Sequence, residues 1–256
     1  MSWYSLLAPD HVYTFLLLFV RLSTLFVFMP FFNHQSVPTT IKAAFAFYLT
    51  LLLYPLMLTV HAPMDAAPFF GAIFSEVALG LLAGAALQIV FAIFSYGGEL
   101  IAFVMGFSLA SVIDPQSQIQ SPLVSQFLTM TALLILLAFN GHHLILLWMV
   151  EALRHAPLGG LVLSHDIFAY LMKAVAGMFM MGFSIAFPIV ALSLLSDIIF
   201  GMLMKTMPQF NLLVVGFPIK IALGFAVWAV VLGSMMLIFK REFLSAIGVL
   251  MRWVGS

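Results

Sequence analysis

This sequence contains no cysteine and very few charged residues. Of its 256 residues only 7% are charged, nine basic and nine acidic, so that the formal net charge is zero. A soluble domain has about 25% charged residues, and the low value here excludes an ordinary soluble protein. A net charge of zero gives no sign of nucleic-acid binding or of a strongly charged lipid-binding surface. Without cysteine, disulfides, thiolate metal sites and cysteine nucleophiles are excluded as well.

Hydrophobic residues make up 64% of the chain, and the mean hydropathy is +1.21. Because a membrane span needs about 20 apolar residues, this predicts an all-α, polytopic integral membrane protein with about six long apolar helices, kinked or broken in places. The long apolar runs cover residues 13–32, 41–60, 68–96, 121–150, 167–200 and 221–239. A kink is expected at Pro55 and a break at Gly97-Gly98. The apolar piece 100–113 is too short to span alone, and with the third run it predicts a broken helix or a hairpin.

The charged residues do not decide an orientation in the membrane. With six spans, the side with both termini holds four basic residues and the other side three, namely Arg154, Lys240, Arg241 and Arg252 against Lys42, Lys205 and Lys220. The positive-inside rule needs a clear excess on one side. Two explanations stay open: a weakly signalled polytopic protein, or apolar runs that face other protein subunits rather than lipid.

A polar segment with two prolines interrupts the apolar sequence at residues 106–122. Asp114-Pro115 favours a turn, because proline disfavours helix in the residue before it. Pro122 favours the start of the next helix. Non-helical backbone inside a membrane persists only where protein buries it or where it lines a watery cavity. The segment therefore predicts a position at a pathway, with an ordinary exposed loop as the alternative.

Several residues inside the apolar runs stand out for their chemistry. Gly80 and Gly84 form a G-x-x-x-G pattern, which lets helices pack closely, either within the chain or between subunits. Ionisable side chains in apolar runs are candidates for function or for structural pairing; they are Arg21, Glu76, Glu99, Lys173 and Asp197. An ion relay would use the three carboxylates, but these are scattered along the chain and basic partners are available for pairing.

The sequence gives little support to a catalytic or metal site. His142-His143, with His155 or Glu151, would supply metal ligands, but adjacent residues of a helix point in different directions. The spacing also matches no known ligand pattern, and a role at a helix end or an interface is the alternative. A Ser-His-Asp order, a glycine-rich phosphate loop and an H-E-x-x-H motif are all missing. We therefore expect no catalytic residue and no metal site.

Two distant stretches of the chain repeat one another. Each has a Met-Pro-x-Phe-Asn motif and an Ile-Lys pair at the same spacing after it, at Met29 to Asn33 with Ile41-Lys42 and at Met207 to Asn211 with Ile219-Lys220. Repeats in membrane proteins commonly place equivalent hairpins around a shared axis. The repeat predicts that both stretches form similar transitions from loop to helix.

Two groups of motifs together carry a family resemblance. The first is G-F-S-L-A-S-V-I-D-P-Q-S-Q from Gly106, followed by Pro122, Ser125-Gln126-Phe127 and Asn140-Gly141-His142-His143. The second is Gly201 to Lys205, Met207 to Asn211 and Gly216 to Ile221, with Arg21-Leu22, Pro30, Val37-Pro38 and Ile41-Lys42 in addition. In these motifs nearly the whole chain resembles the FliR family of flagellar export proteins, to which the injectisome SctT family is related. The G-F-P-I-K form favours a flagellar member, whereas Lys205 and Glu151-Ala-Leu depart from the usual pattern.

The resemblance implies a subunit of the type III export gate rather than an enzyme. Such a subunit works with FliP, FliQ and FlhB homologues in the bacterial inner membrane, at the flagellar basal body, where unfolded export substrates pass through a channel. The resemblance implies a FliP-like part, residues 1–165, followed by a FliQ-like part, residues 166–256. It also implies a plug loop at residues 106–122 and a role in flagellum assembly that needs no cofactor and no nucleic acid.

The resemblance and the sequence patterns together give two sets of candidate site residues. The expected plug or gate residues are Gly106, Phe107, Ser108, Asp114, Pro115, Gln116, Gln118 and Pro122. Residues expected at subunit interfaces or in structural roles are Arg21, Pro30, Lys42, Gly80, Gly84, Pro208, Asn211, Pro218 and Lys220. The alternative function is a stand-alone secondary transporter with a substrate site at the broken region 100–122.

Overall fold

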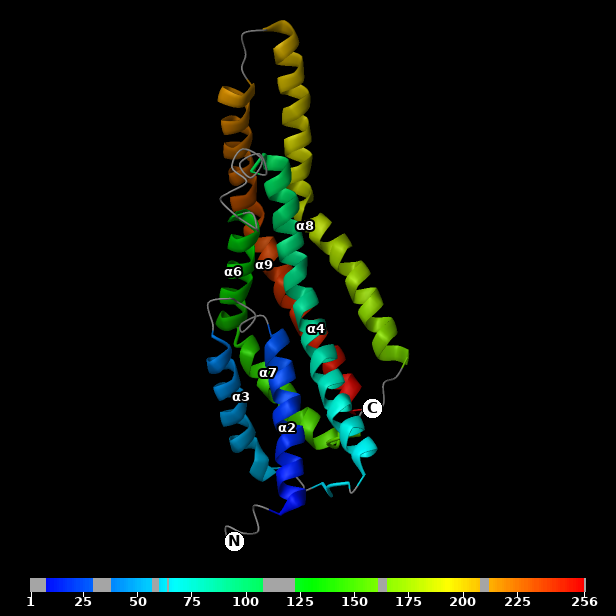
Figure 1. The fold of residues 1–256 in the computed structure, drawn as a ribbon. Coiled ribbons are helices and arrows are strands. Elements are labelled where there is room, and N and C mark those ends of the chain that lie inside the picture. Colours follow the sequence, from blue (N-terminus) through cyan, green and yellow to red (C-terminus); the bar gives the residue numbers. More distant parts are fainter. Residues whose placement is uncertain are drawn as a thin grey trace. The chain divides into compact units, whose positions relative to one another are not determined.

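The computed structural model describes the chain except for residues 1–7, 30–37, 57–59, 64, 108–122, 161–164, 208–211 and 256. Figure 1 shows its helices, which are α2 (Pro9–Phe28), α3 (Thr39–Leu53), the short η1 (Tyr54–Leu56), α4 (Ala66–Met105), α6 (Leu123–Ala138), α7 (Gly141–His155), α8 (His165–Thr206), the π-helical η3 (Leu212–Gly216) and α9 (Phe217–Gly255). The described residues contain no strand, which confirms the all-α class.

Four of the described helices are long and apolar enough to cross a membrane. They cover Pro9–Phe28, Ala66–Met105, Ile167–Thr206 and Val214–Trp253, and the bent pair α6 and α7 would make a fifth span. A polytopic membrane protein is thereby confirmed, but the expected number of about six spans is too high. The difference lies in the run 41–60, because α3 ends at Leu53 and Pro55 lies in the 3-10 turn that follows. Fifteen residues are too few for a span.

The expected break at Gly97-Gly98 is wrong, because α4 continues without interruption to Met105. Both glycines serve close packing instead. A Cβ on Gly97 would lie 3.0 Å from the carbonyl oxygen of Gly182 in α8, and one on Gly98 would lie 3.0 Å from the backbone nitrogen of Ser125 in α6. The described part of the piece 100–113 therefore continues α4 as far as Met105 and is not a separate half-helix, and residues 108–113 lie outside the described residues.

The expected single run 121–150 is also corrected, because a bend divides it into two helices, α6 and α7. The bend lies at Asn140, whose φ of 58° is the left-handed conformation that asparagine tolerates better than most residues. Asn140 precedes α7, and neither α6 nor α7 reaches the length of a span by itself.

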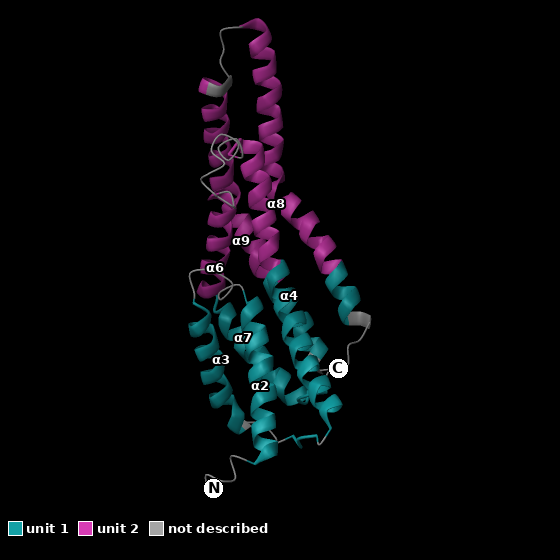
Figure 2. Ribbon diagram, in the orientation of Figure 1, with its two compact units in different colours: residues 1–89, 139–172, 243–256 teal, residues 90–138, 173–242 magenta. Residues whose placement is uncertain are grey.

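The helices divide into two compact units, drawn in teal and magenta in Figure 2. Unit 1 comprises residues 1–89, 139–172 and 243–256, and unit 2 comprises residues 90–138 and 173–242. The chain thus crosses between the units within α4, α8 and α9 and between α6 and α7. The expected division into residues 1–165 and 166–256 concerns likeness to two other proteins and stays a prediction.

Aromatic side chains pack α2 against α3 in unit 1. Phe15 and Phe19 both meet the ring of Phe47, at 5.6 and 6.3 Å between centroids, and Phe26 meets Phe45 at 5.2 Å. These edge-on contacts have the geometry that aromatic pairs prefer. The two helices lie side by side in Figure 1 as well.

In unit 2, the last third of α4 is the element around which the others pack. Phe91 and Phe94 both contact the ring of Phe239 in α9, with centroids 5.1 and 5.3 Å apart. The contacts of Gly97 with α8 and of Gly98 with α6, described above, complete this core. Pro188 lies inside α8, where it cannot donate the helical hydrogen bond, and Figure 1 draws α8 as a bent helix.

Candidate functional site

A buried ion pair joins α2 and α4 inside unit 1. Nε of Arg21 donates to Oε2 of Glu76, and Nη2 of Arg21 donates to Oε1 of the same carboxylate at 2.9 Å. Arg21 is 4% exposed and Glu76 is fully buried. Two parallel hydrogen bonds make a strong arginine–carboxylate contact, and charges at such depth need a partner.

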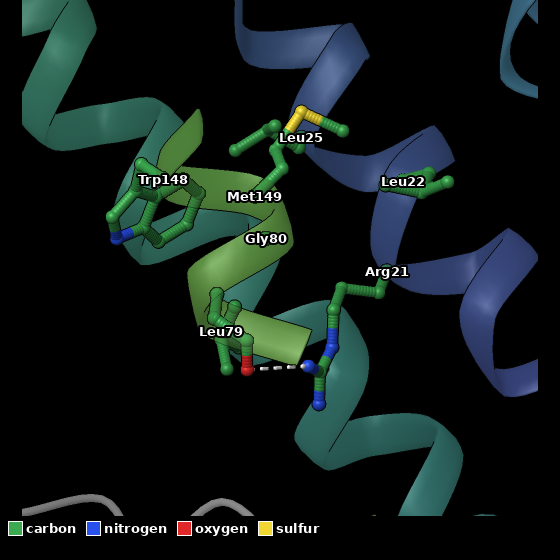
Figure 3. A pocket seen from close by; sticks show the side chains of 8 residues that line it. Arg21, Leu22, Leu25, Leu79, Gly80, Trp148 and Met149 are labelled. Carbon is green, nitrogen blue, oxygen red and sulfur yellow. Dashed lines mark hydrogen bonds between the residues drawn. The ribbon is translucent and has the colours of Figure 1, made fainter. Parts of the chain in front are cut away.

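The same ion pair holds the end of α7. Nη1 of Arg21 donates to the carbonyl oxygen of Ala156 at 3.1 Å and to that of Ala152 at 3.4 Å, and the second bond is drawn in Figure 3. The backbone N–H of Gly159 donates to Oε1 of Glu76 at 2.6 Å. The last carbonyl groups of a helix lack partners within it and favour a nearby positive charge. Arg21 and Glu76 therefore fix α2, α4 and the turn after α7 to one another.

The space beside Arg21 is too small for a substrate. One cavity, shown in Figure 3, has a volume of about 10 Å³. It is lined by Arg21, Leu22, Leu25, Leu79, Gly80, Trp148, Met149 and Ala152. A second cavity of about 30 Å³ also borders Leu79 and Trp148. Such volumes hold about one or two waters. The polar network of unit 1 is accordingly a packing element rather than a substrate site.

Gly80 and Gly84 face α2 within unit 1. A Cβ on Gly80 would lie 2.8 Å from Cβ of Thr24 and 3.0 Å from the carbonyl oxygen of Arg21. A Cβ on Gly84 would collide with Phe28. The G-x-x-x-G pattern thus lets the backbones of α2 and α4 approach each other in the same chain, as small residues do between membrane helices.

The end of α4 leads into the expected plug. Gly106 has a φ of +87°, the N–H of Gly106 donates to the carbonyl of Phe103, and that of Phe107 donates to the carbonyl of Ala102. This is a Schellman motif, in which a glycine in the left-handed conformation closes a helix. Of the expected plug residues, only Gly106 and Phe107 are described; Ser108, Asp114, Pro115, Gln116, Gln118 and Pro122 lie outside the described residues.

Helices α8 and α9 clamp this helix end in unit 2. A Cβ on Gly106 would lie 2.7 Å from Cε1 of Phe217, the first residue of α9. The ring of Phe107 lies 6.2 Å from that of Phe225, and the hydroxyl of Ser193 in α8 donates to the carbonyl of Val104 at 2.8 Å. The backbone at which the segment 106–122 begins is therefore held by three separate contacts.

An ion pair links α8 to α9 close to the same helix end. Nζ of Lys220 donates to both carboxylate oxygens of Asp197, at 2.7 and 2.8 Å. The side chain of Lys220 is 9% exposed and that of Asp197 is 51% exposed. Asp197, like Glu76, is thus paired with a basic side chain, whereas Glu99 is exposed.

The repeated Ile-Lys pairs occupy the same position in their helices. Lys42 is the fourth residue of α3 and Lys220 is the fourth residue of α9. Their surroundings differ, since Lys220 is buried against Asp197 whereas Lys42 is half-buried and makes no ion pair with a described residue.

The other residues expected near the two repeats are only partly described. Pro218 is exposed in the first turn of α9, and Pro30, Pro208 and Asn211 lie outside the described residues. Superposition of the two repeats stays a prediction.

The adjacent histidines begin α7. The rings of His142 and His143 lie 4.1 Å apart between centroids, directly after the bend at Asn140. His155 instead contacts Glu151, at 2.9 Å, on the last turn of the same helix. The described part of the chain holds no group of three or more side chains placed to bind a metal.

Comparison with known proteins gives this geometry a context. The family model of bacterial export proteins, family 1, matches residues 12–246. The chain belongs to the FliR family of these export proteins. It is 34% identical to the flagellar biosynthetic protein FliR of Bacillus subtilis (strain 168) over 235 residues, which cover 90% of each chain. It is 29% identical to the FliR protein of Escherichia coli (strain K12), over 82% of this chain and 80% of that one.

Membership of the FliR family decides the general function. The chain is a membrane-embedded component of flagellar protein export, and it is not an enzyme. The Arg21–Glu76 network, the clamped end of α4 and the Asp197–Lys220 pair are therefore features of an export protein, and none of them needs a catalytic explanation.

Some residues of this FliR-family chain gain importance only from the structure. Gly159, with a φ of +79°, supplies the N–H that binds Glu76, and a Cβ there would lie 3.0 Å from Ala72. Phe217 lies against Gly106. The one sequence signal that could have identified Gly159 is its position shortly after the end of a helix, where glycine is favoured. The contacts of Phe217 have no local signal, because they join residues far apart in the chain.

Proposed function

We propose that this chain forms the channel of the flagellar type III export gate together with FliP and FliQ homologues, beside an FlhB homologue. The complex lies in the bacterial inner membrane at the flagellar basal body, and unfolded export substrates pass through it during flagellum assembly. The observation that carries the proposal is the match to the export family over residues 12–246. Because that match covers nearly the whole chain, a stand-alone transporter is the weaker reading.

The exposed apolar surface of the long helices supports assembly with other subunits. In α8 and α9, the most apolar stretch of 18 residues is only 28% and 17% buried inside the chain, respectively. With 42 and 39 residues, each helix measures about 60 Å along its axis, twice the roughly 30 Å of membrane hydrocarbon. Apolar surface that extends beyond the hydrocarbon needs cover from protein, and neighbouring gate subunits would supply it.

Within this complex, residues 106–122 form the plug that closes the resting channel. The polar composition of the segment supports this role, since irregular backbone at membrane depth is tolerated only where protein buries it or where it lines a watery path. The clamped helix end at Gly106 gives the plug a fixed starting point in unit 2. In the same proposal, residues 1–165 correspond to FliP and residues 166–256 to FliQ.

Co-expression tests the proposal. The tagged chain is produced with FliP and FliQ homologues from the same bacterium, purified in detergent, and the mass of the intact complex is measured. We expect all three proteins in one particle of defined mass, and an aggregated or unstable chain when it is produced alone. A monodisperse chain alone, together with FliP and FliQ that assemble without it, would show that the proposal is wrong.

A further inference from the structure

Four successive residues at the end of α4 are each held by a contact in unit 2. The hydroxyl of Ser193 in α8 donates to the carbonyl oxygen of Val104 at 2.8 Å. The next three residues of the chain meet α9, in the order Met105 with Gly224, Gly106 with Phe217 and Phe107 with Phe225. Figure 1 draws the end of α4 between α8 and α9. The four contacting residues of these two helices are called the socket below: Ser193, Phe217, Gly224 and Phe225.

The socket is built from one face of each helix. In α9, Gly224 and Phe225 follow Phe217 by seven and eight residues, which places all three on the same side of the helix. Lys220, three residues after Phe217 and four before Gly224, lies on that side as well. In α8, Asp197 lies one turn after the serine of the socket. The ion pair of Lys220 with Asp197, with contacts of 2.7 and 2.8 Å, therefore ties the two walls of the socket to each other.

The serine of the socket completes the hydrogen bonds at the end of α4. The last four carbonyl groups of a helix lack partners within it. Two of those in α4 accept from the N–H groups of the Schellman motif, and that of Val104 accepts from Ser193. Val104 thus obtains from α8 a hydrogen bond that its own helix does not supply. A shift of α8 away from α4 would leave this carbonyl group unpaired, which is costly in apolar surroundings.

The two members of the ion pair differ in their exposure. The side chain of Lys220 is 9% exposed and that of Asp197 is 51% exposed. A buried ammonium group without a counter-charge is strongly disfavoured. Removal of the Asp197 carboxylate would therefore force Lys220 out of its place, and the face of α9 that carries the socket would lose its tie to α8.

We propose that Ser193 and the Asp197–Lys220 pair position the start of the plug. They hold the last turn of α4 and the first plug residues in the socket, and the loss of either contact releases them. The inference rests on the proposed function, because the segment 106–122 is the plug in that proposal. It adds that the closed channel depends on contacts outside the segment, made by α8 and α9.

Hydrogen exchange in the co-expressed complex tests the seating of the helix end. Ser193→Ala removes the hydroxyl that binds Val104, whereas Ser193→Thr keeps one. We expect the amide protons of residues 103–107 to exchange about three- to tenfold faster in the alanine variant, the effect of one lost hydrogen bond, and threonine to restore most of the protection. The matched control is Ser196→Ala. This serine is as buried as Ser193, at 4% exposure, but its hydroxyl binds Leu192 of its own helix at 2.9 Å, so that exchange should stay unchanged.

Ion conductance of the reconstituted complex tests the consequence for the channel. We expect Ser193→Ala and Asp197→Asn to conduct ions, at a lower level than a complex from which Asp114–Gln120 is deleted. Ser193→Thr and Asp197→Glu, which keep the hydroxyl and the charge, should stay closed. The Ser193→Ala complex should assemble in the same yield as the wild type, because a merely structural contact would change the yield and not the conductance.

The outcomes separate this inference from the proposed function. If Ser193→Ala and Asp197→Asn exchange or conduct like the wild type while the deletion complex conducts, the inference is overturned and the proposed plug stands. The inference is equally overturned if Ser193→Ala prevents assembly, or if Ser196→Ala has the same effects as Ser193→Ala. If the assembled deletion complex stays closed, the proposed plug itself fails.

Discussion

Arg21 and Glu76 form a two-bond ion pair in the core of unit 1, with 4% and 0% of their surfaces exposed. Removing one partner of a buried pair leaves the other charge without compensation, which costs about 3–5 kcal/mol. We therefore predict that Glu76→Gln lowers the free energy of unfolding by about that amount. Thermal unfolding in detergent measures it. The matched control Glu151→Gln, at a carboxylate that is 42% exposed and contacts His155 on the same helix, should change stability by no more than about 1 kcal/mol, and equal effects of both variants would contradict the role of the pair.

Two glycines of α4 offer a matched comparison of packing. Gly80→Ala places a methyl group 2.8 Å from Cβ of Thr24, whereas Gly71 has nothing within 4 Å. We predict that Gly80→Ala lowers stability by about 1–3 kcal/mol through overpacking. Gly71→Ala should leave stability unchanged or raise it by up to about 1 kcal/mol, because alanine favours helix over glycine. The same unfolding measurement distinguishes the two, and a harmless Gly80→Ala would show that α2 and α4 are not closely packed at this point.

The pairing of Asp197 with Lys220 can be tested by exchanging the charges. Asp197→Lys and Lys220→Asp each place two like charges together, and each should destabilise the complex. The double exchange restores opposite charges across the 2.7 Å contact, so that we predict a favourable coupling energy of about 1 kcal/mol or more in a double-mutant cycle. Additive losses in the double variant would mean that the two residues do not interact.

The contact of Gly106 with Phe217 should make position 106 intolerant of a side chain. Any other residue at a φ of +87° costs about 1–2 kcal/mol, and the added Cβ also meets the ring of Phe217. We predict that Gly106→Ala lowers stability by at least this amount, and that it costs less in a Phe217→Ala background. Gly201→Ala, whose Cβ would meet nothing within 4 Å, is the control. If the two glycine variants behave alike, the Schellman motif at the end of α4 is not formed.

The sequence predicted the class of the protein well because its strongest signals are local or compositional. Long apolar runs and scarce charge predicted membrane helices, and four of them are present at close to the expected positions. Arg21, Glu76 and Asp197 were singled out because charge inside an apolar run is costly. Their partners could not be predicted, since Arg21 and Glu76 are 55 positions apart and the choice of partner depends on packing.

The errors at Gly97-Gly98 and at Asn140 have different physical causes. Glycine allows both a helix break and a close approach of two helices, and sequence alone does not distinguish these uses. At Gly97 the nearby backbone of Gly182 decides for close approach. At Asn140 the error was the reverse. The continuous apolar run 121–150 predicted one helix, whereas the left-handed conformation of Asn140 divides the run into α6 and α7.

The central claim, that residues 106–122 close the export channel, is tested most directly by ion conductance. The co-expressed complex is reconstituted with the chain intact, with Asp114–Gln120 deleted, or with the same residues replaced by glycine and serine. We predict that all three complexes assemble, that the intact one is closed to ions, and that the deletion conducts. The glycine–serine replacement distinguishes the specific plug residues from mere length. A deletion that abolishes assembly, or an assembled deletion complex with unchanged conductance, would contradict the assignment of the plug.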